Sequence, residues 1–137
     1  MDFVRWLQAQ PFWDNTTVVI TGDHHSMDRG YFDRNVPAAY PRMVYNCILN
    51  APVETDNLKN RDYCAIDLFP TTLAVLGCEI EGNRLGLGTN LYSNRPTLAE
   101  EMGFAAFNRA LGQSSSYYEE HFYSDADREM IATRPTH

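Results

Sequence analysis

Val-Val-Ile-Thr-Gly-Asp-His-His, residues 18–25, joins a short apolar run to a cluster of polar side chains. We expect a strand over residues 16–21, because the run is short and apolar. A continuous apolar run is typical of a strand buried on both faces, as in a parallel sheet covered by helices. Ligand-binding groups in such sheets collect where the strands end, and Asp23 and His24 follow this strand directly.

The rest of the chain alternates strand and helix signals. A second strand is predicted over residues 43–49. The next segment, from Asp67 through Gly77, has helical spacing, with Pro70 in the first turn and glycine at the C-terminal end. Further helices are expected at a capping box that starts at Thr97, over 104–111 and over 117–123. The order of these elements predicts an α/β layer structure with a mostly parallel sheet flanked by helices.

Composition limits the function classes. The chain has 137 residues, 44% of them hydrophobic, which suffices for one compact domain. Its formal charge is −7, and its arginines form no run, which argues against binding to nucleic acid. No stretch approaches the ~20 apolar residues that a membrane span requires.

Asp23 and His24 offer a carboxylate oxygen and an imidazole nitrogen side by side, a pair that suits Zn²⁺ or Mn²⁺. Gly22 is expected to let the backbone turn sharply, so that both side chains face one site. The alternative is an ordinary turn in which Asp23 accepts backbone N–H groups and the histidines are solvated. Spacing alone favours the turn, because two ligands do not make a site.

The segment 18–24 resembles the second metal-binding segment of the alkaline-phosphatase/sulfatase superfamily. The closer likeness is to its phosphoglycerol transferase and lipoteichoic acid synthase branch. The likeness continues in matching order over residues 1–123, in the segments Ser26-Met27-Asp28, Arg42-Met43-Val44-Tyr45-Asn46, Ile66-Asp67-Leu68-Phe69-Pro70-Thr71-Thr72-Leu73, Leu85-Gly86-Leu87-Gly88-Thr89-Asn90-Leu91 and Thr97-Leu98-Ala99-Glu100-Glu101. Each segment is weak evidence, whereas the ordered set is strong.

The resemblance implies that Asp23 and His24 are two ligands of a divalent cation, Mn²⁺ or Zn²⁺, with Mg²⁺ as a further candidate. The nucleophilic threonine and the first carboxylate of the family lie on earlier strands, and only fifteen residues precede the strand at 16–21. We therefore expect residues 1–123 to be the C-terminal part of a sulfatase-like catalytic domain, and 124–137 a polar tail that frays. An isolated piece of this kind is expected to be inactive and to self-associate through unpaired strand edges.

The implied reaction transfers a phosphoglycerol group through a covalent threonine intermediate, with no catalytic residue in this chain. The resemblance also implies a donor of the phosphatidylglycerol type and a glycerol- or sugar-containing acceptor polymer of the cell envelope. The catalytic domain would lie outside the cell membrane, tethered by upstream helices that this chain does not include. A sulfatase, a phosphoethanolamine transferase, or a non-catalytic structural or binding remnant are the alternatives.

Two residues near the pair are candidate substrate-binding groups. His25 could assist the substrate phosphate or be a solvated neighbour. Arg29 suits phosphate through its bidentate guanidinium, or pairs with an aspartate of the same loop. The aromatic residues Tyr31, Phe32 and Tyr40 either line a lipid or glycerol pocket or anchor the loop, and Arg42 is expected to pack or pair structurally.

Overall fold

The computed structural model describes residues 2–53 and 60–133. They form a mixed α/β arrangement in two units, Met1–Glu101 and Met102–His137. The elements are α1 (Asp2–Gln8), η1 (Trp13–Asn15), β1 (Val18–Thr21), α2 (Arg29–Asn35), β2 (Asn46–Leu49), η2 (Ala65–Asp67), α3 (Leu68–Val75), η3 (Glu81–Asn83), β3 (Arg84–Leu85), β4 (Gly88–Thr89), α4 (Leu98–Met102), α5 (Phe104–Leu111), α6 (Ser116–Phe122) and α7 (Asp125–Ala132).

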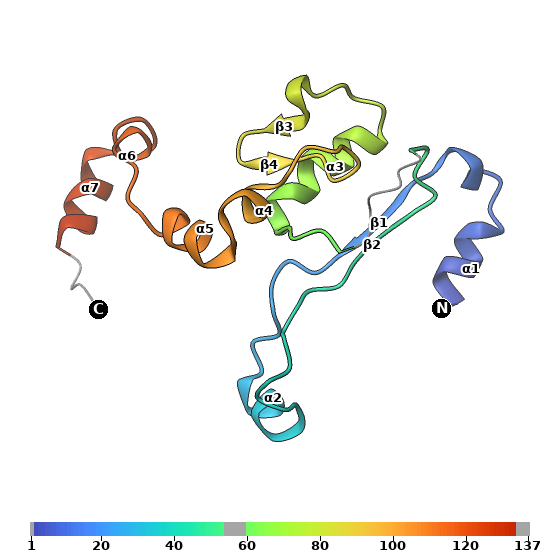
Figure 1. The fold of residues 1–137 in the computed structure, drawn as a ribbon, viewed down its shortest axis with the longest axis horizontal. Helices are drawn as coiled ribbons and strands as arrows, with labels where there is room; N and C mark the ends of the chain where they lie inside the picture. Colours follow the sequence, from blue (N-terminus) through green and yellow to red (C-terminus); the bar gives the residue numbers. More distant parts are fainter. Residues whose placement is uncertain (1, 54–59, 134–137) are drawn as a thin grey trace. The chain divides into compact units, whose positions relative to one another are not determined.

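The two predicted strands exist, but the prediction of a mostly parallel sheet is wrong. β1 and β2 lie antiparallel, with Val18 opposite Leu49 and Thr21 opposite Asn46 (Figure 1). Neither strand is buried on both faces, since all of their residues are half-buried or exposed. The apolar run at 18–20 fits either arrangement, because it fixes the extended backbone and leaves open which partner strand pairs with it.

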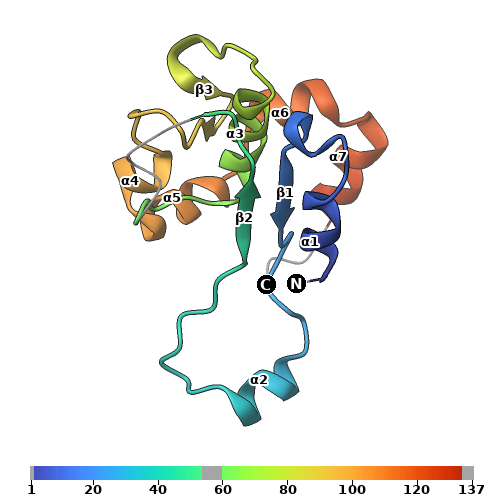
Figure 2. The same ribbon diagram turned by 90° about the vertical axis from the view of Figure 1, so that its right-hand side faces the viewer.

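Both strands of this pair keep one unpaired edge within the described residues, because the sheet contains only β1 and β2. A two-stranded ribbon by itself is marginally stable in water. The backbone groups along each edge remain available for pairing with a further strand. Figure 2 shows the long connection between the two strands, which carries α2 at its far end.

Helix α3 begins and ends as its sequence predicts. Pro70 lies in the first turn, and Gly77 adopts a left-handed backbone with φ of 82° just past the last turn. Two hydrogen bonds close this end, from Gly77 N to Ala74 O at 3.0 Å and from Cys78 N to Leu73 O at 3.0 Å. This pattern is the Schellman motif, in which glycine satisfies the last carbonyls of a helix.

The glycine-containing segment 85–91 takes part in a small hairpin. β3 and β4 pair antiparallel across a two-residue turn, and Gly86 in that turn has φ of 59°. Gly88 is needed for a different reason, since a Cβ there would lie 2.1 Å from the carbonyl oxygen of Ile66. The hairpin therefore lies directly on the start of α3.

The second unit contains helices α5, α6 and α7. The first two lie where helical spacing predicts them. The tail from residue 124, expected to fray, instead forms α7 over Asp125–Ala132, with Ser124 and Asp127 bonded to each other at its start. No helix among the described residues combines the length and apolar character that a membrane span requires.

Candidate metal centre

The candidate site lies at the start of the connection from β1 to β2 (Figure 1). The expected sharp turn at Gly22 is wrong, because its N–H continues the strand pairing by donating to Tyr45 O at 3.0 Å. A Cβ at Gly22 would lie 3.2 Å from that of Val44, so glycine here lets the two segments approach closely. Asp23 and His24 therefore stand at the end of the paired ribbon.

The side chains of Asp23 and His24 converge. Nε2 of His24 lies 3.4 Å from Oδ2 of Asp23, and both side chains are exposed, at 59% and 87% respectively. The other carboxylate oxygen, Oδ1, accepts the backbone N–H of His24 at 2.9 Å. The turn that sequence reasoning offered as the alternative is thus present, and it leaves Oδ2 directed at the imidazole.

The imidazole of His24 is oriented by a hydrogen bond at Nδ1, the ring nitrogen that is not paired with Asp23. Nδ1 lies 2.7 Å from the carbonyl oxygen of His25. A carbonyl can only accept a hydrogen bond, so Nδ1 carries the proton, and in the neutral ring Nε2 keeps its lone pair. Metal-binding histidines are commonly oriented in this way, with one ring N–H donated to a carbonyl or carboxylate. Two electron-rich atoms face each other here, an arrangement that a cation or a proton stabilises.

The spacing of the two atoms fits a metal ion. Bonds of about 2.0–2.2 Å at the tetrahedral angle place two ligand atoms about 3.4 Å apart. The separation between His24 Nε2 and Asp23 Oδ2 is 3.4 Å. Residues 2–53 and 60–133 contain no group of three or more histidine, cysteine, aspartate or glutamate side chains that could hold a metal. Among these residues, Asp23 and His24 therefore offer two potential ligand atoms and not a complete metal site.

His25 does not join the pair. It lines a hollow of about 230 Å³ in the connection between β1 and β2. We call this space the loop hollow; its lining is His25, Ser26, Phe32, Tyr40, Arg42 and Met43. The structural role expected for Arg42 is confirmed, since its guanidinium lies over the Phe32 ring at 4.4 Å and donates to Ser26 O at 2.5 Å.

Arg29 lies at the first position of α2 and is not part of the loop hollow. The alternative ion pairs with Asp28 or Asp33 are not formed either, since no ion pair between described residues contains Arg29 or Arg34. Asp28 instead caps the helix, its Oδ1 accepting Tyr31 N–H at 2.9 Å.

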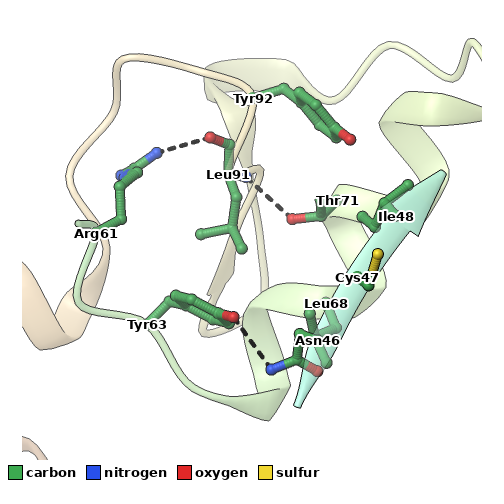
Figure 3. A pocket seen from close by; sticks show the side chains of 9 residues that line it. All are labelled: Asn46, Cys47, Ile48, Arg61, Tyr63, Leu68, Thr71, Leu91 and Tyr92. Carbon is green, nitrogen blue, oxygen red and sulfur yellow. Dashed lines mark hydrogen bonds between the residues drawn. The ribbon is translucent and has the colours of Figure 1, made fainter. Parts of the chain in front are cut away.

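A second cavity, of about 210 Å³, lies between β2 and α3 (Figure 3). Its polar atoms are largely paired with one another. Asn46 Nδ2 donates to the Tyr63 hydroxyl at 3.1 Å, while Thr71 Oγ1 donates to Asp67 O at 2.6 Å and accepts from Leu91 N at 3.0 Å. We therefore interpret it as packing space between strand and helix. The lining residues are Asn46, Cys47, Ile48, Arg61, Tyr63, Leu68, Thr71, Leu91 and Tyr92.

Sequence reasoning assigned Arg42 a structural role and did not anticipate a buried Nε without a hydrogen-bond partner. Ser26 lies 16 residues before Arg42, and Phe32 lies within the helix between them. No local pattern pairs these positions. The available signal was a basic residue four positions before β2, which is weak evidence for such a role.

No family model, no curated protein and no solved structure matches this chain.

Proposed function

We propose that this chain supplies the Asp23–His24 half of a divalent-metal site in a phosphoglycerol transferase similar to lipoteichoic acid synthases. The observation that carries the proposal is the 3.4 Å separation between His24 Nε2 and Asp23 Oδ2, with Nδ1 held by a carbonyl. The ordered segment likeness along residues 1–123 supports the same family. On this proposal the remaining ligands and the nucleophilic threonine belong to another part of the enzyme.

Each residue of the pair has a separate task. Asp23 contributes an anionic oxygen and uses its other oxygen to fix the backbone of His24. His24 contributes a neutral nitrogen whose direction the His25 carbonyl sets. A bound divalent cation would act as a Lewis acid toward a phosphoryl oxygen and the attacking hydroxyl. Neither Asp23 nor His24 acts as a nucleophile.

The open edges of β1 and β2 support the proposal that this chain packs against further sheet. A ribbon of two strands with unpaired edges gains stability from added strands. Such strands would also bring further ligands to the end of the ribbon where Asp23 and His24 lie. In this family the donor is a phosphatidylglycerol-type lipid and the acceptor an envelope polymer, outside the cell membrane.

Manganese titration followed by NMR tests the metal site. We expect Mn²⁺ to broaden the ring signals of His24 first, because this imidazole faces a carboxylate. His121 is an internal control, since its Nδ1 also lies 2.8 Å from a backbone carbonyl, that of Tyr117. No described ion pair contains His121. In Asp23→Asn, broadening of His24 should require about tenfold more Mn²⁺ or higher.

Equal broadening of the two histidines, or an unchanged response in Asp23→Asn, would contradict the metal site. The transferase part needs a second measurement. An enzyme containing this segment should convert fluorescent phosphatidylglycerol to fluorescent diacylglycerol in the presence of Mn²⁺ and an acceptor, because the phosphoglycerol group passes to the threonine and then to the acceptor. Asp23→Asn should abolish that turnover. Metal binding without turnover would instead support a non-catalytic metal-binding domain.

A further inference from the structure

The loop hollow carries hydrogen-bond donors that the chain itself does not use. Nε of Arg42 is shielded from solvent and has no hydrogen-bond partner in the described structure. A guanidinium has five N–H groups, and the bond that the structure shows for this one is from Nη2 to Ser26 O at 2.5 Å. A buried donor without a partner destabilises the fold, so a ligand that accepts from this guanidinium would be stabilised.

The guanidinium of Arg42 is also held in place. It lies 4.4 Å above the Phe32 ring, and the Ser26 carbonyl fixes one end of its plane. A cation that is already oriented loses little conformational entropy when it binds an anion. This pre-organisation distinguishes Arg42 from Arg29, whose side chain forms no ion pair with described residues.

The other groups around the loop hollow favour an anion. The hydroxyls of Ser26 and Tyr40 and the imidazole of His25 add further donors, and no carboxylate lines the hollow. This is unusual for a chain with 18 acidic and 11 basic residues. Asp28, two residues after Ser26, caps α2. Arg42 therefore brings a positive charge to the hollow that no lining carboxylate balances.

The volume of the loop hollow and its apolar side limit the class of ligand that can bind. Its volume is about 230 Å³, room for roughly seven waters at ~30 Å³ each. Phe32 and Met43 provide an apolar side next to the cation. A phosphoryl group with one short organic substituent fits these features, since a planar guanidinium recognises phosphate through two parallel hydrogen bonds.

We infer that the loop hollow binds the phosphoryl group of a small organic phosphate, with Arg42 as its cation. The inference rests on the proposed function in one respect. His25 adjoins His24 in the chain, so an organic phosphate in the hollow would lie beside the proposed metal pair. The phosphate can come from a soluble ester such as glycerol 3-phosphate or from the headgroup of phosphatidylglycerol.

Methyl NMR on chain labelled at the methionine Cε tests the inference. Met43 lines the loop hollow and is 78% exposed. Met27 does not line the hollow and is 82% exposed, so its signal is the control. We expect glycerol 3-phosphate to shift the Met43 signal in a saturable way. Arg42→Gln should weaken that response about tenfold or more, because a charged hydrogen bond is lost. Arg29→Gln removes the same charge outside the hollow and should leave the affinity within about twofold.

Tyr40→Phe is a second test of the hollow, needed because Arg42→Gln could weaken binding by disturbing the loop structure. It removes one hydroxyl from an exposed side chain and should weaken binding about threefold. Vesicles of dioleoylphosphatidylglycerol, with dioleoylphosphatidylcholine as control, separate a lipid headgroup from a soluble phosphate. A shift with either source supports the inference.

Two results would overturn the inference. One is no Met43 shift with either phosphate source. The other is an equal loss of binding in Arg42→Gln and Arg29→Gln, which would indicate general charge attraction. The titrations contain no metal, so phosphate binding without a Mn²⁺ response at His24 would remove the proposed function and keep this site. A Mn²⁺ response without phosphate binding would remove the phosphate site and keep the proposed function.

Discussion

Arg61 and Arg42 lie in two regions of the first unit and differ in how many of their hydrogen-bond donors have partners. Between residues 61 and 101, Arg61 is 6% exposed and uses all of its donors within the chain. Between residues 22 and 45, Arg42 is half-buried and keeps an unpartnered Nε. The first region also contains the buried residues Asp67, Thr71, Thr89 and Thr97, while residues 8–50, all of them described, contain no buried residue.

The difference separates stability from binding. Polar groups that are paired inside the chain stabilise the fold and are unavailable to a ligand. Groups that lack partners cost stability and remain available, which is typical of binding loops carried by a scaffold. We therefore expect substitutions in residues 61–101 to change unfolding, and substitutions in residues 22–45 to change binding.

Of the substitutions considered, Arg61→Ala should lower the free energy of unfolding most. Its guanidinium donates to the carbonyls of Leu91, Ser93 and Arg95 at 3.0, 2.8 and 2.6 Å, and to both oxygens of Glu100 at 3.1 and 2.8 Å. Arg61→Ala leaves a carboxylate and three carbonyls without their donor. We expect a loss of about 3–5 kcal/mol in the free energy of unfolding, measured in urea.

Arg42→Gln is the matched control for Arg61→Ala, because it removes an arginine that donates to one carbonyl. We expect it to cost about 1 kcal/mol or less. A similar loss in both variants would show that the two regions do not differ in the way that the hydrogen bonds indicate.

The next largest effect should come from replacing the two glycines of the β3–β4 hairpin, which should differ in their cost to stability. A Cβ at Gly88 would lie 2.1 Å from Ile66 O, so Gly88→Ala has to displace backbone and should cost about 3 kcal/mol. Gly86 has no atom within 4 Å of its Cβ position but has φ of 59°. Gly86→Ala should therefore cost about 1–2 kcal/mol. Thermal unfolding of both variants measures the difference, and a reversed order would contradict the close approach at Gly88.

The next prediction concerns the charge of Glu100. Its hydrogen bonds with Arg61, aided by the Thr97 backbone, lower its pKa from 4.5 to about 2. A lowered folded-state pKa stabilises the fold above the unfolded value, and this contribution is lost as the pH falls from about 4.5 to about 2. Glu100→Gln should cost about 2 kcal/mol at pH 7, after allowance for a side chain that is 27% exposed, and almost nothing at pH 2.

Glu101→Gln is the control for Glu100→Gln, because Glu101 pairs with Arg84 at 2.8 Å through a side chain that is 40% exposed. We expect a loss of under about 1 kcal/mol at pH 7. If the cost of Glu100→Gln stayed constant from pH 7 to pH 2, the ion pair would not be its cause. Urea unfolding at several pH values gives this comparison.

Features set by neighbours in the chain were predictable. The capping box is confirmed, with Thr97 N donating to Glu100 Oε2 at 2.7 Å and Glu100 N to Thr97 Oγ1 at 3.1 Å. The left-handed Gly77 after α3 is confirmed as well. The contact between the neighbours Asp23 and His24 is likewise local, since Oδ1 of Asp23 accepts the backbone N–H of His24. These features depend on backbone geometry within about four residues, which the sequence shows directly.

Tertiary structure alone decided the partners that lie far apart in the chain. Arg61 and Glu100 are 39 residues apart, and nothing in the spacing of either one identifies the other. The antiparallel pairing of β1 with β2 was mispredicted because an apolar strand forms equally good hydrogen bonds with partners in either direction. The need for glycine at residue 88 arises from the Ile66 backbone. The sequence by itself determined the local caps and the adjacent placement of Asp23 and His24, whereas long-range packing decided which donors of Arg61 and Arg42 found partners.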